Sequence, residues 1–422
     1  METERARKYP FIPGTPALCI VGAVGNYVIT DDGRRILDGA GGAVVNNIGY
    51  GRAEIADIAA RAVSGSGYTL PTFATEARVR LIERLTDRWL PAGLTRCLFV
   101  SGGSESVDTA IRIARQHHEA KGNPNKWKVL GRSISYHGST LASLSVGNHD
   151  RRRAGLGQWI TDLPKIDVYD ADLAAKVVEA EDPASIAAII AEPVIGASGA
   201  AIVPPDDYWP ALRRLCTDND ILLIADEVMT GFGRTGKKMG VDHWSVTPDL
   251  LVGAKGLAGG YAAIGGVFAT DEVVEPLAEG SIMYFTFSGN DLACSIADRV
   301  LQIIEDEGLV GRSAALGDRL RALLEDRLGE HPNVADIRGL GLLQGVELVR
   351  DRATGESFDG QLAMPVVQQA LKRDCWIYPA GSAGVPDGLL FGPAFTISEH
   401  ELEVLVDVAA ESIDAAVAQI NS

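Results

Sequence analysis

The chain has 422 residues, 46% of them apolar, enough to bury a substantial core and too many for a disordered protein. Its 39 Lys and Arg against 56 Asp and Glu give a net charge of −17, which argues against nucleic acid or an anionic membrane as the main partner, because both bind basic faces. Apolar runs such as 221–225 are far shorter than the roughly 20 residues of a membrane-spanning helix, so a transmembrane protein is excluded.

The first residues of the chain and the spacing of the cysteines indicate the cellular compartment of the protein. Residues 1–8 contain no apolar run of the kind found in secretory signals. The five cysteines are far apart and never form a C-x-x-C pair, so neither a disulfide framework nor a zinc site is indicated. We therefore expect free thiols, no metal site and a cytoplasmic protein.

Composition changes along the chain suggest two domains. Residues 1–55 are rich in Gly, Pro and turn signals, whereas from about residue 80 short apolar runs alternate with amphipathic segments. That alternation is typical of βα units around a parallel sheet. After about residue 320, charged helix is followed by short strands. We predict a large α/β domain over 56–320 and a smaller domain built from 1–55 and 321–422.

Six candidate strands lie in the predicted large domain, and several are apolar without alternation, as expected for strands covered by helices on both faces. They span 97–100, 129–135, 187–191, 221–225, 249–254 and 264–269. Ligands of open α/β sheets bind outside the carboxyl ends of the strands. The first five strands are each followed by polar or aromatic residues, so we predict a site at this edge of the sheet.

A glycine loop, Ser101-Gly102-Gly103-Ser104, follows the first of these strands and opens a predicted helix. Bare backbone N–H groups at a helix N-terminus, together with serine hydroxyls, form a cradle for an anion or phosphate. Taken alone, this signal is weak, and Ser104 is better explained as an ordinary helix cap. The spacing matches neither the dinucleotide fingerprint nor the P-loop.

Three further residues sharpen the prediction. Lys255 is surrounded by glycines, and a desolvated lysine has a lowered pKa and can form a Schiff base, although a solvated turn lysine is the alternative. Asp226 ends an apolar strand, where it could pair with a pyridinium N–H, cap a helix or pair with Arg234. Tyr136 either stacks on a flat ring or fills the core. Phosphate cradle, aromatic ring, aspartate and lysine together indicate pyridoxal 5'-phosphate.

The segment Leu222–Gly236 resembles the signature of the class III aminotransferases, pyridoxal phosphate enzymes of fold type I. Further matching motifs are 101–106, 136–138, 191–193, 248–260, 285–290 and 338–341, and the resemblance runs from about residue 10 to the C-terminus. It implies an α/β fold with a mainly parallel seven-stranded sheet in the large domain and a small α+β domain built from both chain ends.

Specific roles follow from the resemblance. Lys255 forms the Schiff base with the cofactor and moves the proton during catalysis, while Asp226 pairs with the pyridine nitrogen. Tyr136 and Val228 enclose the ring, and Gly103 and Ser104 hold the phosphate. The remaining residues that the resemblance places at the cofactor are His137, Glu192, Met229 and Thr286. Thr286 reaches the phosphate from the partner subunit, which implies a homodimer with shared active sites.

The activity implied is a transaminase that moves an amino group from an amine or ω-amino acid to a keto acid, pyruvate or 2-oxoglutarate, by a ping-pong mechanism. The alternative on the same fold is an aminomutase of the glutamate-1-semialdehyde type, an epimerase or a decarboxylase. The continuation Gly233-Arg234-Thr235-Gly236 is more typical of transaminases. A catalytically silent binding protein is disfavoured by the intact Lys255 and Asp226.

Departures from the family pattern bear on the substrate. Met229 stands where many members have Gln, and Ser106 replaces the usual Ala. The segment 387–394 lacks the arginine that many transaminases place just before it to bind a carboxylate. Candidates to supply that charge are Arg52 and the run 151–153, although each is more often a solvated surface residue.

Overall fold

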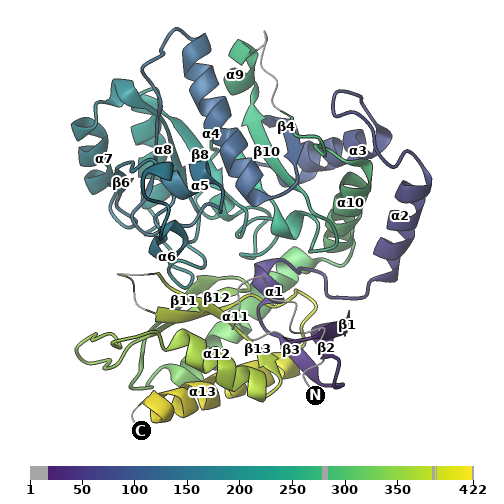
Figure 1. Ribbon diagram of the computed structural model, residues 1–422, viewed down its shortest axis with the longest axis vertical. Helices are drawn as coiled ribbons and strands as arrows, with labels where there is room; N and C mark the ends of the chain where they lie inside the picture. Colours follow the sequence, from purple (N-terminus) through teal and green to yellow (C-terminus); the bar gives the residue numbers. More distant parts are fainter. Residues whose placement is uncertain (1–17, 278–283, 383–384, 386, 421–422) are drawn as a thin grey trace.

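The computed structural model of the protein describes residues 18–277, 284–382, 385 and 387–420. The first eight residues, for which we predict no secretory signal, lie outside this part of the chain. A large sheet flanked by helices occupies the upper part of the molecule, and two smaller sheets with long helices occupy the lower part (Figure 1).

The large sheet has seven strands in the order β4-β10-β9-β8-β7-β5-β6. Their bounds are β4 (Leu94–Val100), β5 (Lys128–Arg132), β6 (Lys165–Ile166), β7 (Ile186–Ala191), β8 (Leu222–Asp226), β9 (Leu250–Gly253) and β10 (Gly265–Thr270). Only β10 runs antiparallel to its neighbours, so the predicted mainly parallel seven-stranded sheet is confirmed. The sequence prediction lacked β6, because two residues leave no pattern to detect.

One strand ends earlier than predicted. The expected strand over 129–135 stops at Arg132, and Ser135 turns back so that its hydroxyl donates to the Arg132 carbonyl. The segment that follows also packs closely on β5, because a Cβ at Gly131 would lie 1.9 Å from the carbonyl oxygen of Val146. The chain after β5 therefore leaves the sheet and carries 133–138 over its edge.

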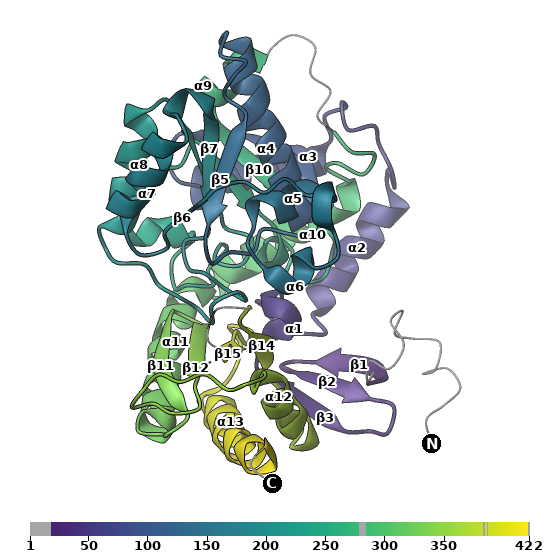
Figure 2. The same ribbon diagram turned by 60° about the vertical axis from the view of Figure 1, so that its left-hand side comes forward.

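Both faces of the large sheet are covered, which explains the apolar strands (Figures 1 and 2). Helix α4 (Gly103–Ala120) packs on one face, where Ile190, Ile224 and Val252 share a core with it. Alternate strand residues face the other core, which contains residues of the helices α3 (Glu76–Arg84), α7 (Ala171–Ala180), α8 (Tyr208–Asp218) and α10 (Asp291–Asp306). Helix α7 contacts both α8 and the edge strand β6.

The lower part joins the two ends of the chain. Strands β1 (Ile20–Val24), β2 (Tyr27–Thr30) and β3 (Arg35–Asp38) form a sheet with the distant β13 (Cys375–Trp376), which pairs with β3 in parallel. A second sheet has the order β11-β12-β15-β14, with β11 (Val334–Leu340), β12 (Leu343–Leu348), β14 (Tyr378–Ala380) and β15 (Asp387–Phe391). The predicted boundaries at 55 and 320 stay predictions, and α11 (Leu309–Leu328) runs across the second of them.

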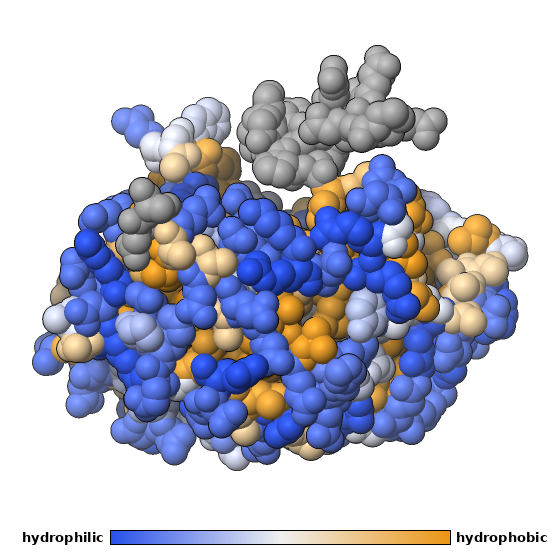
Figure 3. Space-filling view, turned by 90° about the horizontal axis from the view of Figure 1, so that it is seen from below, coloured by the Kyte–Doolittle hydropathy of each residue, from blue (hydrophilic) through white to orange (hydrophobic). Residues whose placement is uncertain are grey.

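Helices α12 (Ala363–Lys372) and α13 (Glu399–Ile420) pack side by side at the base of the lower part. The face seen from below is mainly hydrophilic, with small groups of hydrophobic residues between charged ones (Figure 3). None of the helices in the described ranges is long and apolar enough to cross a membrane. The remaining helices are α1 (Gly41–Val44), α2 (Ala53–Ser64), α5 (Leu141–Val146), α6 (Asp150–Arg153) and α9 (Asp271–Val274).

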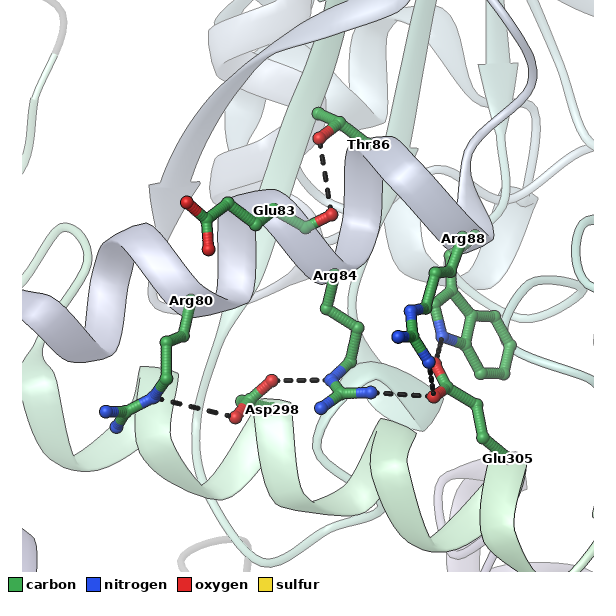
Figure 4. Close-up of polar contacts among 8 residues, drawn as sticks. Arg80, Glu83, Arg84, Thr86, Arg88, Asp298 and Glu305 are labelled. Carbon is green, nitrogen blue, oxygen red and sulfur yellow. Dashed lines mark hydrogen bonds and ion pairs between the residues drawn. The ribbon is translucent and has the colours of Figure 1, made fainter.

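An ion-pair network fastens α3 and the following π-helical turn, η2 (Leu85–Trp89), to α10 (Figure 4). The Arg84 guanidinium bridges Asp298 and Glu305, two carboxylates that point up from α10, with Nη1 2.7 Å from Glu305 Oε2. Glu305 also accepts the indole N–H of Trp89 at 2.7 Å. Because these side chains are largely shielded from water, their interactions are screened less than surface pairs.

We expect Glu305→Ala to lower the free energy of unfolding by about 1–3 kcal/mol, since it leaves the Trp89 indole N–H without its acceptor and removes one of the two carboxylates that pair with Arg84. Thermal denaturation of the purified variant measures the change. Asp407→Ala, which removes the exposed partner of Arg327, is the matched control and should shift the melting temperature much less. Equal shifts in the two variants would show that the network contributes no more than a surface pair.

Candidate active site

A cavity of about 300 Å³ opens at the edge of the large sheet where the parallel strands end. Nine of the ten residues that the sequence places at the cofactor line it. Its lining comprises Val45, Ser101, Gly102, Gly103, Ser104, Tyr136, His137, Gly138, Glu192, Ala197, Asp226, Val228, Met229, Ala254, Lys255, Ala262, Ala263 and Ile264. The topology thus gathers residues from β4, β5, β7, β8 and β9 into one site.

The glycine loop lies between β4 and α4, with Gly102 as the N-cap residue of the helix. A glycine has no side chain with which to cap, so the first N–H groups of this helix are left for a ligand. Position 103 favours glycine, because a Cβ there would lie 2.9 Å from the Val228 side chain, which would have to move. Ser104 Oγ accepts the backbone N–H of Ser139 at 3.0 Å, which joins the loop to the segment after β5.

Asp226 ends β8 and is only 4% exposed. His137 Nδ1 lies 2.7 Å from Asp226 Oδ2, and the Val228 N–H donates to Oδ1 at 3.1 Å. Each carboxylate oxygen retains a further acceptor position. The alternative in which Arg234 pairs with Asp226 is wrong: Arg234 is buried elsewhere, where its guanidinium donates to the carbonyls of Leu342 and Pro393 and to Asn47.

Lys255 follows β9 in a short helical turn and adopts a positive φ of 44°. Tight packing requires the adjacent glycine, since a Cβ at Gly256 would lie 2.4 Å from the Asn47 amide. The Lys255 ammonium makes no hydrogen bond or ion pair within the described part of the chain. Burial lowers the pKa of Lys255 to about 8, against the opposing pull of the Asp226 and Glu192 carboxylates.

Glu192 follows β7 and is held by backbone N–H groups. Its Oε1 accepts the Tyr136 N–H at 3.0 Å, and its Oε2 accepts the Gly196 N–H at 3.0 Å. Desolvation raises the pKa of this carboxyl group. The contact fixes Tyr136, whose hydroxyl lies 2.9 Å from Ser139 Oγ, at the wall of the cavity.

The sequence prediction missed part of the lining. Residues 262–264 border the cavity because β10 is antiparallel, so that its beginning lies at the same edge as the ends of its neighbours. A search restricted to strand ends could not find them. Val45 comes from the N-terminal part of the chain, where no motif marked it.

Two departures from the family pattern have visible contacts. Ser106 donates its hydroxyl to Gly102 O at 3.0 Å and Gly253 O at 3.3 Å, which ties the glycine loop to the strand that precedes Lys255. Met229 lies against Gly196, where a Cβ would be 2.1 Å from its sulfur. Its thioether offers only a weak acceptor at a position where an amide could hold a hydroxyl.

Thr286 is the one predicted cofactor residue that does not line the cavity of its own chain. It is exposed, in a turn that precedes α10. Its expected action on the neighbouring subunit stays a prediction.

At this sheet edge, Lys255 has no partner among the described residues, Asp226 is buried, and the N-terminus of α4 has no side-chain cap, an arrangement that suits a pyridoxal phosphate enzyme. The chain matches the family described as aminotransferase class-III over residues 13–413, and it belongs to that family. The protein is therefore an aminotransferase that depends on pyridoxal phosphate.

Individual relatives agree with this assignment. The chain is 33% identical to the putrescine–pyruvate aminotransferase of Pseudomonas aeruginosa, covering 96% of this chain and 92% of that one. It is 34% identical to the diaminobutyrate–2-oxoglutarate transaminase of Halomonas elongata, with 93% and 89% covered. Among solved structures, an (S)-enantioselective omega-transaminase from Thermomicrobium roseum matches with a TM-score of 0.92, 34% identity and 98% and 97% covered.

The residues present fit the cofactor. The unpaired amine of Lys255 suits its aldehyde, the free acceptor positions of Asp226 suit its ring N–H, and the start of α4 suits its phosphate. The Nε2 atom of His137 is buried and has no hydrogen-bond partner among the described residues. The His137 ring therefore contacts Asp226 through Nδ1 and makes no second hydrogen bond within this part of the chain.

The Lys255 environment predicts a pH dependence for the apoenzyme. Only the neutral amine is nucleophilic, so its reaction with added pyridoxal phosphate should accelerate as pH rises through the pKa of about 8. Stopped-flow absorbance between about pH 6 and 11.5 measures the rate, a window that covers both a midpoint near 8 and the ordinary lysine pKa. Lys255→Arg is a control that forms no such product. A midpoint near the ordinary lysine pKa of about 10.4 would contradict the account.

Proposed function

We propose that the enzyme transfers the amino group of an amine or ω-amino acid donor to a keto acid acceptor, pyruvate or 2-oxoglutarate. The observation that carries the proposal is the composition of the cavity: Lys255 is the only lysine or arginine among the described lining residues. The other described lining residues include no lysine or arginine to bind a substrate carboxylate, which suits an amine donor, and the carboxylate of the keto acid has to be met by a side chain outside this lining.

The residues of the chain perform distinct parts of the chemistry. Bound pyridoxal phosphate supplies the electron sink that makes the substrate C–H bond adjacent to nitrogen acidic. Asp226, oriented by His137 and the Val228 N–H, stabilises the positive charge on the ring nitrogen. Lys255 accepts the proton from the substrate carbon and returns it to the cofactor side, a role suited to an amine with a pKa of about 8.

The overall balance is that of two half-reactions. The amine donor leaves as a carbonyl compound after depositing its amino group on the enzyme, and the keto acid leaves as an amino acid after taking it up. The named activities of the relatives, with putrescine and pyruvate in one case and diaminobutyrate and 2-oxoglutarate in the other, support this donor and acceptor range.

A panel of donors tests the proposal. Putrescine, taurine, 2,4-diaminobutyrate and 1-phenylethylamine are each incubated with pyruvate or 2-oxoglutarate, and alanine or glutamate is quantified. We expect acceptor-dependent formation of the amino acid from at least one amine, and a loss of activity of about a thousandfold or more in Asp226→Ala that exceeds the loss expected from any accompanying fall in stability. An isomerised product formed without any keto acid would contradict transamination.

We also propose that two chains associate so that Thr286 of one completes the site of the other. An apolar surface supports this, formed by Tyr68, Leu70, Phe73, Tyr284 and Phe287, all more than 40% exposed. The rings of Tyr68 and Phe287 meet edge to face at 6.0 Å, and Arg78 joins the two segments by donating to the carbonyls of Phe73 and Gly289. Exposed aromatic clusters of this kind mark interfaces.

Phe287→Asp should shift the protein from dimer to monomer and weaken its affinity for pyridoxal phosphate, because the neighbouring Thr286 is then withdrawn from the site. Sedimentation velocity and a cofactor titration measure the two effects. Trp127→Asp, at a similarly exposed aromatic near the opposite edge of the sheet, is the control and should leave both unchanged. A fully dimeric Phe287→Asp protein would contradict the assignment.

The cysteine pattern of the sequence is the basis for proposing a cytoplasmic location.

A further inference from the structure

The carboxylate of a keto acid needs a cationic partner, and the structure narrows the choice among the candidate arginines. Arg52 is paired with Glu54 and Glu307. Arg153 is paired with Asp162 at 3.1 Å and also donates to Asn148. These guanidinium groups are therefore occupied by partners within the chain.

The neighbouring Arg151 is directed away from the site. Its guanidinium donates to Gln361, and both residues line a separate cavity that also contains Asp387. Residues 151–153 belong to helix α6, which lies at the bottom of the upper part of the molecule, next to the lower part (Figures 1 and 2).

Arg152 differs from these residues. Its guanidinium carbon lies 4.5 Å from the centroid of the Tyr136 ring, and Tyr136 lines the active-site cavity. Arg152 is exposed and makes no ion pair within the described part of the chain. His149 packs edge to face on the same ring at 6.0 Å, and burial lowers its pKa, which disfavours a second positive charge beside this ring.

We propose that Arg152 recognises the carboxylate of the keto acid acceptor. The planar guanidinium can donate two parallel hydrogen bonds to a carboxylate while its face stays on the aromatic ring. Tyr136, fixed through Glu192 and Ser139, holds the guanidinium beside the cavity, close enough to Lys255 that its charge contributes to lowering the pKa of that amine. An amine donor without a carboxylate does not use this contact.

This inference rests on the proposed transaminase function. The two half-reactions are measured separately, so that failure of the Arg152 role can be told apart from failure of the transaminase function. In Arg152→Gln, we expect the KM for pyruvate to rise about tenfold or more, with the KM for butanal, an acceptor without a carboxylate, changed less than about twofold. The donor half-reaction with putrescine should keep its rate. Arg151→Gln is the matched control and should behave as the parent enzyme, and Arg152→Lys should recover part of the pyruvate affinity.

A binding measurement gives a readout independent of turnover. Propionate, which has a carboxylate but no group that reacts, should bind the parent enzyme and Arg151→Gln alike and Arg152→Gln about tenfold more weakly in isothermal titration calorimetry. If pyruvate and butanal are slowed equally, or propionate affinity is unchanged, Arg152 only supports Tyr136 and the inference is wrong. If the parent enzyme transfers no amino group from any donor, the proposed function itself fails.

Discussion

A carboxylate buried at the end of a central strand has to be matched by donors, and this requirement organises the site. Asp226 is 4% exposed and is matched by His137 Nδ1 and the Val228 N–H. His137 comes from the segment after β5, so the match fixes the neighbouring Tyr136 as well. Val228 in turn packs where Gly103 has no side chain, which places the start of α4. One buried charge thus positions the residues that would surround a pyridinium ring.

The same edge sets the properties of the lysine. Lys255 is placed at the end of β9 by glycines that permit close packing against Asn47 and Phe232. Its ammonium is left without a partner in the described structure, and desolvation outweighs the attraction of the nearby carboxylates, which lowers its pKa. An amine whose pKa is lowered to about 8 has a larger neutral fraction near neutral pH than an ordinary lysine. Because the neutral amine is the nucleophile, and because Lys255 lines a cavity, it can form a bond to a carbonyl carbon there.

Much of this arrangement was predictable because parallel strands deliver their following residues to one edge. The glycine loop, His137, Glu192, Asp226 and Lys255 all follow strands that the apolar pattern identified. The missed parts have physical reasons. Ala262–Ile264 precede an antiparallel strand, whose direction depends on pairing with β4 and β9 that no local pattern encodes. Val45 reaches the site through the packing of the N-terminal segment. Arg234 donates to the backbone carbonyls of Leu342 and Pro393 and does not pair with Asp226, and such carbonyl contacts are not revealed by sequence spacing.

The proposed chemistry depends on covalent attachment of the cofactor to Lys255. The direct measurement is borohydride reduction of the yellow holoenzyme, followed by proteolysis and mass spectrometry of the peptides. The account predicts bleaching of the colour and a single reduced pyridoxyl phosphate adduct on Lys255. An adduct on another lysine, or no adduct on the peptide that contains residues 253–260, would contradict it.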